Sequence, residues 1–130
     1  MARILVVDDD PDIRGLVLRR TEAAGHQVLG AADAAEALAL VREKGAPEVV
    51  VLDVVMPETD GLTLLGQLRA ETGQPALPAV FLSGRIEADD IEAGRALGAR
   101  YLTKPFVASA LLGAIDAALA DVTGTRQTGW

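Results

Sequence analysis

The chain contains five short apolar runs, and their length and pattern limit its possible folds more than any other feature. The runs are rich in β-branched residues and too short for ordinary helices, which is typical of strands. The central runs do not alternate apolar with polar residues, and a strand that is apolar on both faces belongs in a parallel sheet covered by helices on both sides. The sequence therefore predicts a buried parallel sheet. Its predicted strands lie at residues 4–7, 27–31, 49–52, 79–82 and, more weakly, 101–102.

Helical patterns separate these runs, and three of them have recognisable ends. An aspartate precedes each of the three as a candidate N-cap, and a glycine follows each as a candidate stop. The first also has Pro11 at its first helical position, and the second has the spacing of a capping box with aspartate in the Ser/Thr position. The candidate caps are Asp10, Asp33 and Asp60, and the candidate stops are Gly25, Gly45 and Gly73.

Two further helices are expected nearer the C-terminus. A fourth over about residues 87–97 has a thin apolar face, and Gly94 weakens its interior by about 1 kcal/mol relative to alanine. Because strand and helix alternate five times, the sequence predicts a doubly wound α/β fold, (βα)5. We expect the flavodoxin-like strand order 2-1-3-4-5, in which the first and third strands are neighbours where the winding reverses. The fifth helix is expected to place one apolar stripe against the sheet, formed by Val107, Leu111, Ile115, Ala118 and Leu119.

Length and composition indicate one domain without a polyanionic partner. The 130 residues are 50% hydrophobic, which is enough for one core, and we expect a single domain over residues 1–120 and a tail at 121–130. The net charge of -7 argues against direct binding to nucleic acid or to an anionic membrane.

The absence of cysteine excludes disulfides and thiolate metal sites. No apolar run approaches the roughly 20 residues that span a bilayer, and aspartates from Asp8 onward interrupt the apolar N-terminal segment, so we expect a cytoplasmic protein.

Three aspartates follow strands that should be neighbours. Asp8 and Asp9 close the first strand, and Asp53 ends the third. Ligands of an open parallel sheet collect at the carboxyl ends of the strands where the winding reverses, so these side chains should converge. Neighbouring carboxylates raise one another's pKa unless a cation compensates for their negative charge. The ligands are hard oxygens, and this topology places the only histidine, His26, far away, which favours Mg²⁺ with Mn²⁺ as a substitute. Asp53 can then act as a nucleophile that forms an aspartyl phosphate.

An ordered set of short motifs makes the chain resemble the receiver domain of bacterial two-component response regulators. The resemblance covers essentially residues 3–120, and each motif stands at the end of a predicted strand. One acidic pair would be weak evidence, whereas five correctly ordered signatures are specific. The motifs are Asp8-Asp9, Asp53 with Met56-Pro57 and Asp60-Gly61, Ser83-Gly84, Tyr101, and Lys104-Pro105-Phe106.

This resemblance implies how a phosphoryl group would be received. Asp53 would be the phosphoacceptor, served by a phosphohistidine on a sensor histidine kinase or a histidine phosphotransfer protein. Lys104 would pair with Asp53 and the phosphoryl oxygens, and the Ser83 hydroxyl would bond a phosphoryl oxygen. Tyr101 would be an aromatic switch that moves inward when Ser83 is drawn towards the phosphoryl group. The Lys104–Pro105 bond is expected to be cis.

The resemblance also implies a set of ligands for the metal ion. Asp9 would bind Mg²⁺ directly, Asp8 through water, and Val55 through its backbone carbonyl, with Asp53 completing the protein ligands. Binding of the metal would neutralise charge during transfer from an anionic donor. The output implied is a changed protein-binding surface, whose partner the sequence does not identify.

The sequence departs from the commonest pattern of this family in two places. Val107 stands where many relatives have a Ser or Thr cap, so the start of the last helix should be weakly capped. Val54 and Val55, beside the phosphoacceptor, are apolar and position no attacking water. We therefore expect a protein that catalyses its own phosphorylation and only slow dephosphorylation, rather than a conventional enzyme.

Two alternatives have to be weighed against this interpretation. The first is a receiver that only dimerises or docks, without phosphorylation, and the complete set of acidic, serine and lysine residues argues against it. The second is a phosphatase with an aspartyl nucleophile on a related sheet. Such enzymes have Asp-x-Asp-x-Thr/Val near the first strand, and residues 8–12 lack the final Thr or Val.

Overall fold

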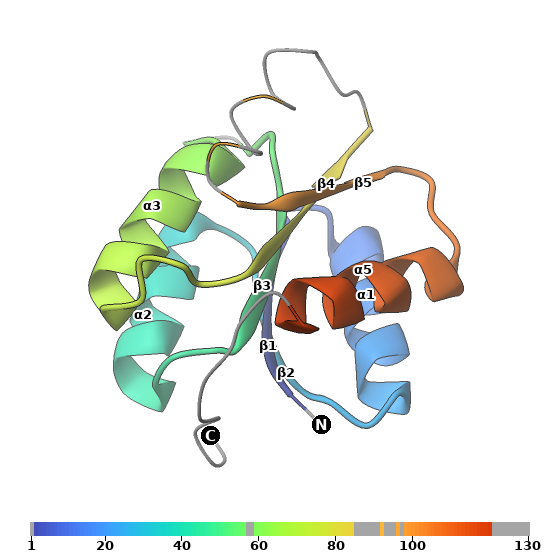
Figure 1. Cartoon of the computed structure of the whole chain (residues 1–130), viewed down its shortest axis with the longest axis horizontal. Coiled ribbons are helices and arrows are strands. Elements are labelled where there is room, and N and C mark those ends of the chain that lie inside the picture. Colours follow the sequence, from blue (N-terminus) through green and yellow to red (C-terminus); the bar gives the residue numbers. More distant parts are fainter. Residues whose placement is uncertain (1, 57–58, 85–91, 93–95, 97, 121–130) are drawn as a thin grey trace.

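Five parallel strands form a single sheet in the order β2-β1-β3-β4-β5, and helices cover both of its faces (Figure 1). The structure, a computed structural model, describes residues 2–56, 59–84, 92, 96 and 98–120. Helices α2 and α3 lie on one face of the sheet, and α1 and α5 lie on the other. The strands are β1 (Arg3–Val7), β2 (Gln27–Ala31), β3 (Val49–Asp53), β4 (Ala79–Ser83) and β5 (Arg100–Thr103), and the helices are α1 (Pro11–Ala23), α2 (Ala34–Lys44), α3 (Gly61–Thr72) and α5 (Ala108–Ala120).

The register of the sheet places the ends of β1 and β3 side by side. β1 pairs with β2 on one edge and with β3 on the other, where Val7 lies opposite Leu52. β3 also pairs with β4, so that Asp53 lies opposite Leu82. The chain therefore winds outward from β1 to β2 and then returns to the other side of β1, which is the reversal that the sequence predicted. The predicted fold class and strand order are confirmed.

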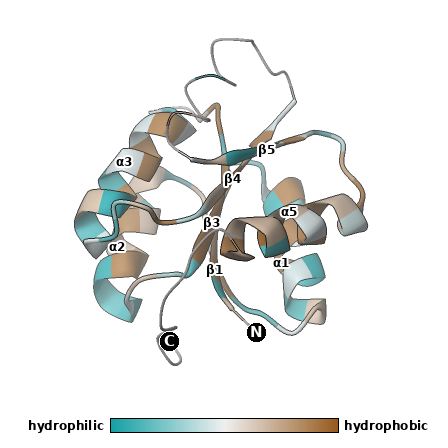
Figure 2. Cartoon of the chain, viewed as in Figure 1, coloured by the Kyte–Doolittle hydropathy of each residue, from teal (hydrophilic) through white to brown (hydrophobic). Residues whose placement is uncertain are grey.

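The central strands are buried because both faces of the sheet are covered. All residues of β1, β3 and β4 are buried. Alternate residues of β3 enter different layers, since Val50 and Leu52 pack on the side of α2 and α3 whereas Val51 packs on the side of α1 and α5. Figure 2 shows these strands as a hydrophobic centre between helices of mixed polarity. Two covered faces explain why the apolar runs lack alternation.

The three predicted helix caps are confirmed. The side chains of Asp10, Asp33 and Asp60 each accept a hydrogen bond from a backbone N–H two or three residues later. Each bond satisfies an amide that has no partner inside the helix. At the other end of α3, Gly73 adopts the left-handed conformation with φ of 68°, where the absence of a Cβ avoids strain. Within the described ranges, no helix has the length and apolar character needed to cross a membrane.

The start of α5 differs from the prediction. Leu111, Ile115 and Ala118 are buried against the sheet as expected, but Val107 precedes the helix and is 65% exposed. Because Val107 lies outside the helix, the 3.6-residue period that turns the other stripe residues towards the sheet does not apply to it. Its placement on the apolar stripe was wrong. Its aliphatic side chain also offers no acceptor to cap α5.

Two predicted segments fall outside the described residues. The fourth helix was expected over residues 87–97, of which the structure describes only 92 and 96, and the tail was expected at 121–130. Both stay predictions, as does the domain boundary at residue 120.

Candidate functional site

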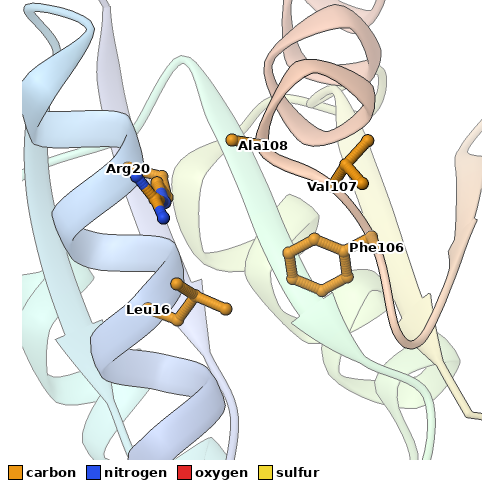
Figure 3. A pocket seen from close by; sticks show the side chains of 5 residues that line it. All are labelled: Leu16, Arg20, Phe106, Val107 and Ala108. Atoms are coloured by element: carbon orange, nitrogen blue, oxygen red, sulfur yellow. The ribbon is translucent and has the colours of Figure 1, made fainter.

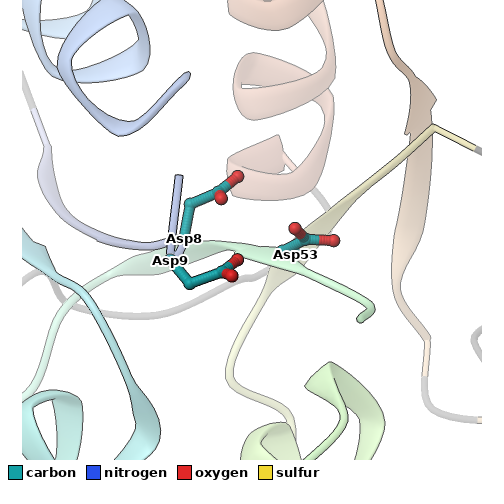
Figure 4. A group of neighbouring side chains, drawn as sticks. All are labelled: Asp8, Asp9 and Asp53. Carbon is teal, nitrogen blue, oxygen red and sulfur yellow. The ribbon is translucent and has the colours of Figure 1, made fainter. Parts of the chain in front are cut away.

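Three carboxylates meet at the carboxyl ends of β1 and β3 (Figure 4). One oxygen from each of Asp8, Asp9 and Asp53 lies within 4.8 Å of the others. The Asp8 side chain is fully buried and Asp53 is nearly so, whereas Asp9 is exposed. The sequence predicted this convergence from the strand order, and the three side chains lie together as predicted. Oxygen donors alone, with no thiolate or imidazole among them, fit a hard divalent cation such as Mg²⁺.

A lysine that follows the edge strand β5 bridges two of these carboxylates. The Nζ atom of Lys104 lies 3.1 Å from an oxygen of Asp8 and 3.1 Å from an oxygen of Asp53. The backbone of Lys104 is anchored as well, because its N–H donates to the carbonyl of Ser83 at 2.7 Å. The Lys104–Pro105 bond is cis, as predicted. Lys104 therefore joins the aspartates that end β1 and β3.

The buried charges at this site perturb one another. Burial raises the pKa of Asp8 above its ordinary value of 3.8, and the charge of Asp53 acts in the same direction, while hydrogen bonds from Asp10 N–H and Lys104 offset part of the rise. Burial alone would lower the pKa of Lys104, but its hydrogen bonds to Asp53 and Asp8 and their charges outweigh burial and raise that pKa. Lys104 therefore stays protonated, and the negative charge of Asp8 is favoured by any further cation at the site.

The loop after Asp53 is held by close backbone contacts. Val55 N–H donates to the Asp53 carboxylate at 3.1 Å, and Gly61 N–H donates to the carbonyl of Val54 at 2.7 Å. A Cβ at Gly61 would lie 2.3 Å from the backbone oxygen of Asp53 and 3.1 Å from the ring of Phe81. The first residue of α3 therefore has to be glycine for the helix to approach the end of β3 so closely. The motif Asp60-Gly61 marked this position in the sequence, but its steric reason was missed.

A second contact that the sequence did not indicate supports the Asp8 turn. Asp8 accepts a hydrogen bond from the backbone N–H of Asp10 at 2.9 Å, and Arg14 Nη1 donates to the backbone carbonyl of Asp8 at 2.8 Å. Arg14 lies in the first turn of α1. No motif in the sequence marked Arg14, because its contact depends on how α1 packs beside the end of β1.

The two predicted switch residues lie on the adjacent strands. Ser83 ends β4 and is buried, in register with Thr103 of β5. Tyr101 is half-buried, and its ring packs against Phe81 with centroids 5.3 Å apart and planes tilted by 36°. Tyr101 therefore lies on the strand next to Ser83, two residues before the position opposite it.

A pocket opens between α1 and the start of α5 (Figure 3). Its volume is about 270 Å³, and it is lined by apolar groups together with one arginine. Phe106 and Val107 follow Lys104 by two and three residues in the chain. Its lining residues are Leu16, Arg20, Phe106, Val107 and Ala108.

His26 lies away from the site, as predicted. Its Nδ1 accepts a hydrogen bond from the backbone N–H of Ala2 at 3.0 Å, near the start of β1. The carboxylates stand at the opposite end of that strand. The histidine therefore links the chain segments that begin β1 and β2.

A doubly wound sheet with carboxylates and a lysine at the ends of its strands is the arrangement expected of a receiver domain, and comparison with known proteins supports this class. Residues 4–116 match the family described as the response regulator receiver domain. Protein PilH of Pseudomonas aeruginosa is 39% identical over 121 residues, which covers 92% of this chain and 99% of PilH. The chemotaxis protein CheY4 of Vibrio cholerae has a similar structure, with a TM-score of 0.84 and 32% identity over 91% of this chain and 98% of CheY4. The chain belongs to the response regulator receiver domain family.

Some relatives are longer than this chain. The transcriptional regulatory protein PrrA of Mycobacterium tuberculosis is 41% identical over 118 residues, which are 90% of this chain and 49% of PrrA. The chain therefore spans about half the length of that relative. The function shared across these matches is that of a receiver domain in two-component signalling, which agrees with a phosphoacceptor role.

Proposed function

We propose that Asp53 receives a phosphoryl group from a phosphohistidine on a partner kinase or phosphotransfer protein, in a Mg²⁺-dependent reaction. The observation that carries this proposal is the position of Lys104 Nζ, 3.1 Å from both Asp53 and Asp8 within a group of three carboxylates. A nucleophilic carboxylate, a candidate cation site and a fixed ammonium then surround one place where a phosphoryl group can be received. Positioning and charge neutralisation do most of the catalysis in such a transfer.

The bond changes of the transfer follow from this arrangement. An oxygen of Asp53 forms a bond to phosphorus while the bond between phosphorus and the imidazole nitrogen breaks, and the imidazole keeps the electron pair. Lys104 exchanges part of its contact with Asp53 for a phosphoryl oxygen, and the Ser83 hydroxyl donates to another. Asp9 directly, Asp8 through water, Asp53 and the Val55 carbonyl would hold Mg²⁺, which when bound neutralises charge on the phosphoryl oxygens.

The phosphoryl group would then change the surface near β5. Ser83, drawn towards the new anion, would leave space for Tyr101 to move inward on the ring of Phe81, which it already contacts. To turn an inactive to active ratio of 99:1 into 1:99, phosphorylation must favour the active form by about 5.5 kcal/mol. The half-buried position of Tyr101 suits a side chain with two available environments.

Two measurements test the proposal. Incubation with Mg²⁺ and acetyl phosphate should add the mass of one phosphoryl group to the intact protein, and chelation of Mg²⁺ should prevent this. Beryllofluoride, which imitates the aspartyl phosphate, should change the NMR signals of Ser83 and Tyr101. An unchanged mass and unchanged spectra would favour a receiver that only docks.

We also propose that the pocket between α1 and the start of α5 receives a helix of the phosphohistidine partner. An incoming imidazole has to reach Asp53, and the lining of the pocket includes Arg20 and, from the segment that follows Lys104, the apolar side chains of Phe106 and Val107. Val107 is the large apolar side chain exposed there.

Replacing Val107 with glutamate should therefore slow phosphotransfer from a cognate kinase by about tenfold, since loss of an interface anchor commonly costs more than 1 kcal/mol. The rate with acetyl phosphate, which needs no docking, should stay native. Val107→Ile is the matched control and should leave both rates unchanged. Equal slowing with both donors would contradict a docking role.

The phosphorylated form should be long-lived, because Val54 and Val55 offer no group to position a hydrolytic water. Val55 is 72% exposed, so a polar side chain fits there without strain. Val55→Asn should hasten loss of the phosphoryl group by about tenfold or more by holding a water molecule. Following the phosphoprotein by mass after the donor is removed measures this. A native lifetime of seconds, or equal rates for Val55→Asn and the control Val55→Leu, would contradict the prediction.

A further inference from the structure

Arg14 makes a contact that the sequence pattern of its helix does not account for. It lies in the first turn of α1, where the positive end of the helix dipole disfavours a cation. Its guanidinium nevertheless turns back to the end of β1, where Nη1 donates to the Asp8 carbonyl at 2.8 Å. A tertiary contact therefore holds this cation at an electrostatically unfavourable position.

The Asp8 carbonyl needs such a donor because it lies beyond the paired part of β1. Pairing of β1 with both neighbours ends at Val7, and the Asp8 N–H then donates to the Ala31 carbonyl at 3.1 Å. Arg14 supplies the Asp8 carbonyl with the hydrogen bond that a strand would otherwise provide. A side chain thus continues the hydrogen bonding of β1 one residue beyond its last strand pair.

The neighbouring strand leaves room for the arginine stem. A Cβ at Gly30 of β2 would lie 2.9 Å from a methyl group of Leu18 and 3.5 Å from Cδ of Arg14. The absence of a side chain at residue 30 lets α1 carry Leu18 and Arg14 close over β2. The close packing of α1 on β2 therefore lets the Arg14 side chain reach the Asp8 carbonyl.

We propose that Arg14 is a positioning residue for the metal site. The peptide group between Asp8 and Asp9 is planar, so fixing the Asp8 carbonyl also fixes the Asp9 amide and limits how that residue can rotate. This peptide group joins Asp8 and Asp9, and the carboxylates of both residues belong to the group that can hold a cation. Arg14 orients them through the backbone without touching the ion. This inference rests on the proposed Mg²⁺-dependent function.

Measuring Mg²⁺ affinity tests the inference, because the two possible roles of Arg14 predict opposite results. If Arg14 orients the ligands, Arg14→Met should weaken Mg²⁺ binding by about tenfold, as the loss of outer-shell partners commonly does. If Arg14 acts only as a nearby positive charge, its removal should strengthen Mg²⁺ binding. Isothermal titration calorimetry at fixed ionic strength gives the affinity, and thermal unfolding without Mg²⁺ shows whether the fold is kept.

Two further variants complete the experiment. Arg19→Met removes an exposed cation from the same helix and should leave Mg²⁺ affinity native. Arg14→Lys keeps the charge but loses the reach and planar geometry of the guanidinium, so it should bind Mg²⁺ more weakly than the native chain, and it serves if Arg14→Met fails to fold. With acetyl phosphate, Arg14→Met should need about tenfold more Mg²⁺ for half-maximal rate while its rate at saturating Mg²⁺ stays close to native.

The outcomes separate this inference from the function on which it rests. Native or stronger Mg²⁺ binding by Arg14→Met, with a native chain that binds Mg²⁺, overturns the positioning role alone. A native chain that binds no Mg²⁺ and accepts no phosphoryl group overturns the proposed function as well.

Discussion

Replacing Asp53 with asparagine should lower Mg²⁺-dependent phosphoryl uptake from acetyl phosphate by at least about 1,000-fold, because an amide is a far weaker nucleophile than a carboxylate. The substitution preserves the shape of the side chain, and the amide oxygen of the variant can still accept the hydrogen bond that Val55 N–H donates to Asp53 at 3.1 Å. Lys104 keeps its contact with Asp8. Intact-protein mass spectrometry over time measures the uptake.

The control for this variant is Asp12→Asn. Asp12 is exposed in α1, so the change removes the same charge from the chain at a position outside the carboxylate group. Asp12→Asn should take up the phosphoryl group at the native rate. Uptake by Asp53→Asn at the rate of this control would show that another residue is the acceptor.

Replacing Gly61 with alanine should lower the free energy of unfolding by about 3 kcal/mol, the upper part of the usual range for overpacking. The added methyl group would meet the backbone oxygen of Asp53 at 2.3 Å and the ring of Phe81 at 3.1 Å, and Phe81 is fully buried. Neither neighbour can yield as the end of a flexible side chain would, so α3 has to move away from β3. Urea denaturation measures the change.

Gly66→Ala is the matched control in the same helix. A Cβ at Gly66 would meet nothing within 4 Å, and alanine is favoured over glycine in a helix interior by about 1 kcal/mol. This variant should therefore be as stable as the native chain or more so. Equal destabilisation by the two substitutions would mean that loss of glycine flexibility, and not the approach to Asp53, sets the cost.

The Gly61 change should also act on function. Moving the start of α3 disturbs the hydrogen bond from Gly61 N–H to Val54 and, through it, the loop that presents Asp53. Val55, whose carbonyl is a proposed Mg²⁺ ligand, is paired with Asp60 in the same loop. Weaker Mg²⁺ binding is thus expected together with lower stability, whereas Gly66→Ala should bind Mg²⁺ normally.

Local patterns in the sequence were sufficient to predict the architecture. Apolar runs that do not alternate with polar residues are typical of strands covered on both faces. The aspartate before each of α1, α2 and α3 accepts the hydrogen bond expected of an N-cap. These signals act over a few residues and do not depend on the rest of the chain. The convergence of Asp8 and Asp53 also followed, because strand order alone brings the ends of β1 and β3 together.

Contacts between elements were not predictable in the same way. Val107 continued an apolar period in the sequence, yet it is exposed because α5 begins one residue later. The contact from Arg14 to Asp8 depends on how closely α1 lies over β2, and the steric limit at Gly61 depends on how closely α3 approaches β3.

The sequence by itself determined the sheet, its winding, most helix ends and the chemical groups at the site. Only the tertiary structure decided that Arg14 contacts the backbone carbonyl of Asp8 and that Gly61 lies against the backbone oxygen of Asp53. The physical reason is that periodicity and capping are short-range preferences of the chain, whereas a separation such as the 2.8 Å between Arg14 and Asp8 results from the packing of whole elements against one another.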